Sequence, residues 1–65
     1  MLNPEEQDIY DFIKKRENFV KYYEIEGYAR ARGIGSPFKV LQRLTDLNKI
    51  EIMPTRKGQM MYRAK

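Results

Sequence analysis

A five-residue segment in the middle of the chain combines the end signal of one helix with the start signal of another. The segment reads Gly33-Ile34-Gly35-Ser36-Pro37. Gly33 suits the left-handed backbone conformation that ends many helices. Ser36 is a preferred helix cap and Pro37 is favoured at the first helical position. Two helices joined by so short a turn are typical of a helix-turn-helix.

Apolar residues recur at helical spacing on both sides of this turn. They predict one helix over residues 22–32 and another over residues 37–48. The later helix is strongly two-sided, so we expect one side to be buried and the other to face solvent. Its apolar side comprises Val40, Leu41, Leu44 and Leu47, and its polar side comprises Lys39, Gln42 and Asp46, flanked by Phe38, Arg43 and Thr45.

The N-terminal segment has the signals of a further helix. Asn3 can cap it, Pro4 suits the first helical position, and Glu6 follows the cap by three residues, as in a capping box. The helix is predicted over residues 4–16. Its buried stripe is formed by Ile9, Phe12 and Ile13.

The remaining segments have β character. Residues 19–21 are either a short strand or the lead-in to the helix that follows. Residues 50–52 alternate apolar and polar, which predicts a strand with Glu51 facing water. A polar turn over residues 55–59 precedes a returning strand at residues 60–63. We therefore expect a small α+β fold, three helices and a C-terminal β-hairpin, in a single domain spanning residues 1–65.

Charge is segregated along the chain. Residues 1–26 carry four bases and seven acids, a net −3, whereas residues 27–65 carry nine bases and two acids, a net +7. Positive charge gathered in one part of a small protein is typical of polyanion binding. The alternative is a basic protein without a polyanion partner.

The 65 residues include no cysteine and no histidine. Without cysteine there is no disulfide, and without cysteine or histidine there is no zinc site of the usual kind. The soft nucleophile and the usual general base are absent as well. No glycine-rich phosphate loop is present. We expect no enzymatic activity and no cofactor. No apolar run approaches the ~20 residues that span a membrane, which favours an intracellular, cytoplasmic and nucleoid-associated protein with no membrane partner.

Three parts of the chain carry a family resemblance: Tyr28 to Ser36, the apolar positions Val40, Leu44 and Leu47, and Asn48-Lys49-Ile50. In these segments the chain resembles the winged helix-turn-helix DNA-binding domain family, in the form of the small regulators of bacteria, archaea and their viruses. Members commonly have a Gly-Ile-Ser type of turn and an apolar entry into the hairpin, or wing. The chain departs from this pattern by one extra turn residue, Gly35, and by Arg32 at a usual leucine position.

The resemblance implies that the 37–48 helix enters the major groove and that the wing reaches the backbone or the minor groove. Lys or Arg can bond a guanine edge, and Gln can pair with adenine. Ser36 and the amides beside it can hold a phosphate. Phe38 either contacts a thymine methyl group or seals the turn. The candidate DNA-binding residues are Arg30, Arg32, Ser36, Phe38, Lys39, Gln42, Arg43, Arg56 and Lys57.

The sequence thus favours a double-stranded DNA-binding protein, most simply a small transcriptional regulator. The alternative is a winged-helix protein–protein interaction module of a larger assembly, such as replication, polymerase or filament machinery. In that alternative, the acidic first helix and the Met60-Met61 pair form the contact surface. Both roles are compatible with a homodimer, whose two copies would contact each other through the first helix, the strand near Phe19 or the edge of the wing.

Overall fold

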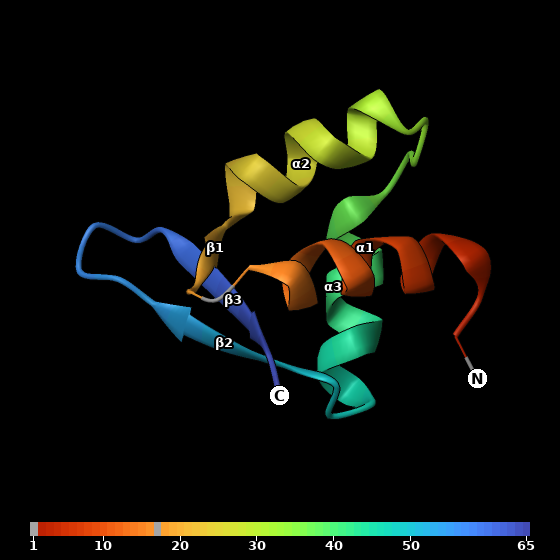
Figure 1. Cartoon of the computed structure of the whole chain (residues 1–65). Helices are drawn as coiled ribbons and strands as arrows, with labels where there is room; N and C mark the ends of the chain where they lie inside the picture. The colour runs from red at the N-terminus through yellow and green to blue at the C-terminus, as the bar shows by residue number, and fades with distance from the viewer. Residues whose placement is uncertain (1, 17) are drawn as a thin grey trace.

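The computed structural model describes residues 2–16 and 18–65. Within them the chain forms three helices and a three-stranded antiparallel sheet (Figure 1). This arrangement confirms the predicted small α+β, winged-helix-like fold. The elements are α1 (Pro4–Lys15), β1 (Val20–Lys21), α2 (Tyr22–Ala31), α3 (Pro37–Asp46), β2 (Ile50–Pro54) and β3 (Met60–Ala64).

Helix α1 begins at the predicted capping box. The Asn3 side chain accepts a hydrogen bond from the Glu6 amide at 2.8 Å, and the Glu6 carboxylate accepts one from the Asn3 amide at 2.9 Å. These two bonds satisfy amides that the first helical turn leaves without a backbone partner. The helix ends at Lys15, one residue before the expected end, because the backbone of Arg16 is extended.

Helix α2 ends at Gly33 by the predicted mechanism. Gly33 has φ +74°, its amide donates to Arg30 O at 3.2 Å, and the amide of buried Ile34 donates to Ala29 O at 2.8 Å. These bonds form a Schellman motif, which satisfies the last carbonyls of the helix. The helix stops at Ala31, so Arg32 lies just beyond it rather than on it.

Helix α3 starts at Pro37 as predicted, but three other expectations for it are wrong. Ser36 occupies the cap position without making a side-chain cap hydrogen bond. The helix ends at Asp46 rather than at residue 48, because Asn48 has φ +62° and the Lys49 amide donates to Leu44 O. Leu47, expected on the buried side, lies past this end and is 41% exposed.

The sheet has the order β1-β3-β2, so β3 is central and β2 lies at an edge. The segment near residue 20 is the short-strand alternative, and Val20 pairs with Tyr62 of β3. Strands β2 and β3 form the predicted hairpin. Its turn is closed by the Thr55 amide bonding to Gln59 O at 2.8 Å, with Gly58 at φ +79°. The tip projects beyond the helices (Figure 1).

One apolar cluster joins the three helices to the sheet. Helix α1 packs on α3 and β3, and α3 also contacts β2. Phe12 of α1 stacks on Tyr28 of α2 with ring centroids 4.2 Å apart, and Tyr22 packs against the core. Phe12 thus lies on the packed side of α1, as its spacing predicts. The buried cluster comprises Ile9, Ile13, Val20, Ile25, Ala29, Ile34, Val40, Leu41, Leu44, Ile50 and Tyr62.

Candidate nucleic-acid interface

The outer face of α3 is open to solvent along its polar residues. Because Val40, Leu41 and Leu44 point into the core, the opposite side of the helix must face outward. Lys39, Gln42, Arg43 and Asp46 are all exposed there. The prediction that this face is uncovered is therefore confirmed.

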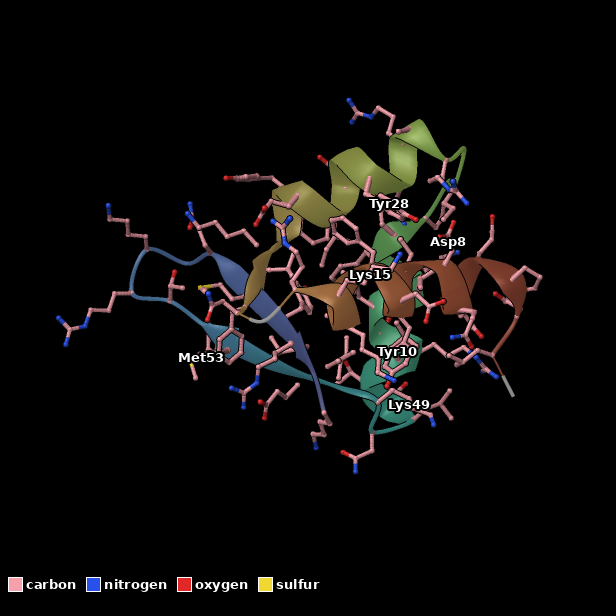
Figure 2. All side chains as sticks on the ribbon, viewed as in Figure 1. Asp8, Tyr10, Lys15, Tyr28, Lys49 and Met53 are labelled. Atoms are coloured by element: carbon pink, nitrogen blue, oxygen red, sulfur yellow. The ribbon has the colours of Figure 1, made fainter. Side chains whose placement is uncertain are left out.

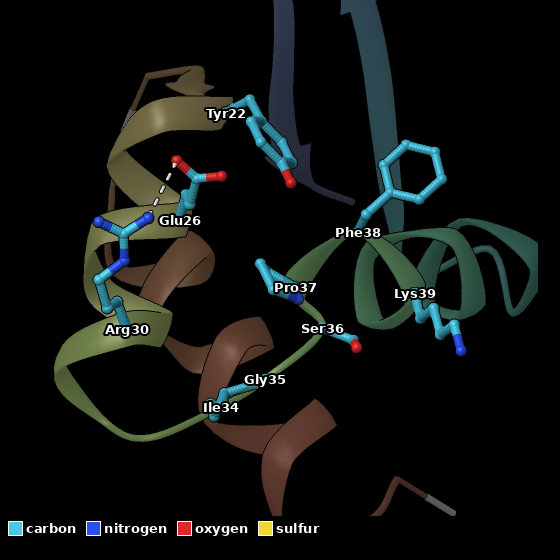
Figure 3. A pocket seen from close by; sticks show the side chains of 9 residues that line it. All are labelled: Tyr22, Glu26, Arg30, Ile34, Gly35, Ser36, Pro37, Phe38 and Lys39. Atoms are coloured by element: carbon cyan, nitrogen blue, oxygen red, sulfur yellow. Dashed lines mark ion pairs between the residues drawn. The ribbon is translucent and has the colours of Figure 1, made fainter.

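A surface hollow of about 550 Å³ lies beside the N-terminus of α3, between that helix and α2 (Figure 3). Phe38, on its wall, is 60% exposed, so it does not seal the turn. Figure 3 shows the Phe38 ring directed toward the strands, while Lys39 leaves the helix in a different direction. The start of α3 thus offers an apolar group on one side and a cation on another.

The first turn of α3 has uncapped amides. The Val40 amide donates to Ser36 O at 3.2 Å and begins the helical pattern. Pro37 has no amide hydrogen, and within residues 2–16 and 18–65 the Phe38 and Lys39 amides have no hydrogen-bond acceptor. Free amides at a helix N-terminus attract acceptors with negative charge. Ser36 is exposed beside these amides, and its hydroxyl does not make the expected cap hydrogen bond.

The hairpin tip carries two cations. Arg56 and Lys57 are exposed in the turn between β2 and β3. Figure 2 shows nitrogen-tipped side chains reaching outward from this turn. Neither residue forms an ion pair with any acid in the described part of the chain. Both side chains are therefore available to an outside anion.

Two other predicted cations are engaged by acids of α1. Arg43 Nε lies 2.6 Å from Glu6 Oε2, and Arg32 Nε donates to Asp8 Oδ2 at 3.0 Å. Local spacing would instead pair Arg43 with Asp46, which lies on the same helix. Asp46 forms no ion pair within the described residues. The Glu6 contact was missed because it depends on α1 packing against α3, which local spacing does not reveal.

Arg30 and Arg32, two of the candidate DNA-binding residues, have different surroundings. Arg30 lies on α2 with an 82% exposed side chain, and its contact with Glu26 is long, at 3.9 Å. Arg32 is instead directed to α1, where Asp8 also accepts a hydrogen bond from the Tyr28 hydroxyl (Figure 2). Asp8 therefore neutralises Arg32 in the free protein, which weakens the attraction of Arg32 for a phosphate.

The Asp8 cluster shifts the titration of its members. The hydrogen bond from Tyr28 holds the pKa of the Asp8 carboxyl below its usual 3.8, and the Arg32 guanidinium lowers it further. The same hydrogen bond raises the pKa of Tyr28 above its usual 10.0. Charge-assisted bonds of this kind favour the ionised carboxylate and the neutral phenol. Asp8 therefore stays anionic at neutral pH and holds Arg32 in place.

The candidate interface thus consists of the exposed face of α3, the uncapped amides of its first turn and the wing tip. Lys39, Arg56 and Lys57 are its cations without an ion pair among the described residues. Comparisons of the chain with protein-family models, with curated proteins and with solved structures found no match. Among the described residues, no helix has the length and apolar character needed to cross a bilayer.

Proposed function

We propose that this protein binds double-stranded DNA, most simply as a small transcriptional regulator acting on DNA in the cytoplasm. Helix α3 enters the major groove, and the wing tip contacts the backbone or the minor groove. The observation that carries the proposal is the open polar face of α3, with Lys39 and Gln42 exposed, in one small fold with the exposed cations of the wing tip.

Docking is electrostatic in this proposal. Lys39, Arg56 and Lys57 meet the polyanion, releasing counterions from the DNA. The free amides at the start of α3, with the Ser36 hydroxyl, hold one phosphate and set the position of the helix along the groove. Arg30 lies further out on α2 and reaches the flanking backbone.

Sequence is read by the outer face of α3. Gln42 can donate to and accept from an adenine edge, and Arg43 or Lys39 can donate to guanine. Phe38 supplies an apolar surface for a thymine methyl group. Asp46, which would repel phosphates, can accept from a cytosine amine in the same groove.

The direct test is selection of bound duplexes from a random pool, followed by affinity measurements on the enriched duplex. Gln42→Ala should cost about 1–3 kcal/mol on the preferred base pair and relax the preference there. Lys57→Ala, a wing-tip control, should weaken all duplexes by similar factors. Absence of duplex binding at low salt would reject the proposal. Identical effects of the two variants on every duplex would show that α3 does not read bases.

A protein-interaction role is the second candidate, and exposed apolar residues favour it. Tyr23 and Phe38 are each 60% exposed, and Met60, which lines surface hollows with each of them, is also exposed. Exposed apolar groups that lie near one another often mark contact surfaces. Crosslinking that retrieves a defined protein partner, together with no affinity for duplex, would support this role over DNA binding.

A homodimer is compatible with both roles. Strand β2 is an edge of the sheet, but Pro54 at its end lacks an amide donor, which limits pairing with another strand. A twofold dimer would recognise half-sites about one helical turn apart. Light scattering on the free protein and on the complex measures the stoichiometry directly.

A further inference from the structure

Glu6 is the single buried charged residue in the described part of the chain, and it lies beneath the proposed reading face. Glu6 as a whole is only 4% exposed. One carboxylate oxygen accepts the Asn3 amide in the capping box, and the other lies 2.6 Å from Arg43 Nε. A single carboxylate therefore joins the first turn of α1 to the outer side of α3.

We infer that Glu6 is a positioning residue that orients Arg43 for a guanine edge; the inference rests on the proposed DNA binding. The contact is made through Nε, while more than half of the Arg43 side chain remains exposed. A guanine contact uses two terminal donors of the guanidinium together, and this geometry requires a fixed fork. The ion pair holds the guanidinium against Glu6, which restricts the side chain before DNA arrives and lowers the entropy lost on binding.

The same ion pair reduces attraction to unspecific DNA. Glu6 neutralises Arg43 in the free protein, so this arginine contributes less to phosphate attraction that is independent of sequence. A correct base pair can still use the outer donors of the oriented guanidinium. Removal of the Glu6 charge should therefore raise the affinity for unspecific DNA and lower the discrimination between base pairs. A purely structural role for Glu6 would instead lower both together.

The test variant is Glu6→Gln, because glutamine also serves at this position of a capping box. The matched control is Glu5→Gln, which makes the same charge change one residue away, at an exposed side chain outside the Arg43 ion pair. The probes are the duplex enriched from the random pool, the same duplex with its Arg43-dependent guanine pair replaced, and an unrelated duplex. Circular dichroism melting confirms that each variant is folded.

Glu6→Gln should lower discrimination at the guanine pair about fivefold to tenfold, at the low end of what a bidentate contact supplies. It should also raise affinity for the unrelated duplex and make the salt slope steeper, by up to about 0.9. Glu5→Gln should leave discrimination unchanged. In the Arg43→Ala background, Glu6→Gln should cause no further loss of discrimination, because the two residues act as one unit.

Two results would overturn the inference while duplex binding itself stands. One is unchanged discrimination in folded Glu6→Gln, and the other is a selected motif in which no guanine depends on Arg43. A wild-type protein that binds no duplex rejects the proposed function first, which is a separate outcome. If Glu6→Gln does not fold, Arg43→Lys replaces it: lysine keeps the charge near Glu6 but lacks the fork. Unchanged discrimination in Arg43→Lys would overturn the inference equally.

Discussion

The Tyr28 hydroxyl and the Asp8 carboxylate connect two helices that are far apart in sequence. Asp8 of α1 accepts from Tyr28 and from Arg32, which closes the end of α2 onto α1. The Tyr28 ring also stacks on Phe12 of α1. A polar bond and an apolar contact from the same tyrosine thus fix one orientation of α2 relative to α1.

This cluster predicts a specific pH dependence of stability. The folded-state pKa of Asp8 lies below 3.8, so its contribution is fully present above that pH and is lost as the pH falls through the folded-state pKa. Tyr28→Phe should move the pKa of Asp8 back toward 3.8, with Arg32 still lowering it, and make acid unfolding less steep. Carboxyl NMR titration of Asp8 measures the shift directly.

Tyr23→Phe is the matched control, because Tyr23 is exposed and makes no hydrogen bond among the described residues. It should leave the Asp8 titration unchanged. The stability at alkaline pH gives an independent check of the hydrogen bond between Tyr28 and Asp8. Because the pKa of Tyr28 is raised above 10.0, its contribution is present below pH 10 and is lost as the pH rises through the folded-state value. An Asp8 titration identical in wild type and Tyr28→Phe would contradict this account.

At the scale of elements, α2 and α3 end by the same backbone geometry with different residues. Gly33 occupies the left-handed position after α2, and Asn48 occupies the equivalent position after α3. In each case the next amide bonds back to a carbonyl five residues earlier. The direction of the chain leaving each helix, and hence the approach of α3 and β2, depends on these two residues.

Gly33→Ala should therefore destabilise the protein by about 1 kcal/mol, because an L side chain is strained at φ +74° although no atom beyond the adjoining residues lies within 4 Å of the added methyl group. Gly35→Ala is the matched control two residues away, with equal space and no positive φ in the left-handed range. It should be neutral or stabilise by a few tenths of a kcal/mol. Urea unfolding of both variants measures the difference. Equal destabilisation would exclude backbone strain as the cause.

The predictable parts of this fold are those that depend on neighbouring residues. The capping box at Asn3, the helix end at Gly33 and the start at Pro37 all involve partners within five positions, so their patterns are visible in the sequence. The predicted side-chain cap at Ser36 does not form because the Ser36 backbone has ψ +71°, whereas Asn3, whose side chain does cap a helix, has ψ 169°. The backbone at Ser36 lies in a turn whose path also depends on how buried Ile34 packs, and spacing does not reveal that packing.

The candidate site divides in the same way. The exposure of Lys39, Gln42 and Arg43 follows from helical periodicity, and the structure bears it out. The pairing of Arg43 with Glu6 joins residues 37 positions apart and requires α1 to lie against α3. Leu47 fits the apolar stripe by spacing, but the helix ends before it. Periodicity assigns a face only for as long as the helix continues.

At the scale of the whole molecule, acids from the acidic N-terminal part of the chain lie next to arginines in the folded structure. Within residues 2–16 and 18–65, five ion pairs join acids to arginines, and four of them use acids from the acidic N-terminal part of the chain. In four of these pairs both partners are partly exposed, so each of the four contributes little to folding, typically 0–1 kcal/mol. The Arg43–Glu6 pair differs because its carboxylate is buried. Pairing instead decides which cations stay available, namely Lys39 on α3 and Arg56 and Lys57 at the wing tip within the proposed interface.

Salt should therefore affect binding and folding very differently. If three available cations meet DNA, the slope of log K against log salt is about −2.7, and tenfold more salt weakens binding on the order of 500-fold. The free energy of unfolding should change by no more than about 1 kcal/mol over the same range, because exposed ion pairs are weak. Fluorescence anisotropy with a labelled duplex measures the DNA affinity, and urea unfolding measures the free energy of unfolding. Both are carried out at about 50 and about 500 mM salt.

Replacing Lys39, Arg56 and Lys57 by glutamine together should remove about 2.7 from the magnitude of the slope and leave only the contribution of Arg30. Unfolding should stay almost unchanged, since none of the three has an ion pair among the described residues. The matched control replaces Lys14, Lys15 and Lys49, three exposed lysines outside the proposed interface, by glutamine. It removes the same charge but should leave most of the slope, because a slope reports the cations that actually contact phosphates. Equal slopes for the two triple variants would mean that net charge alone attracts DNA, with no defined docking face.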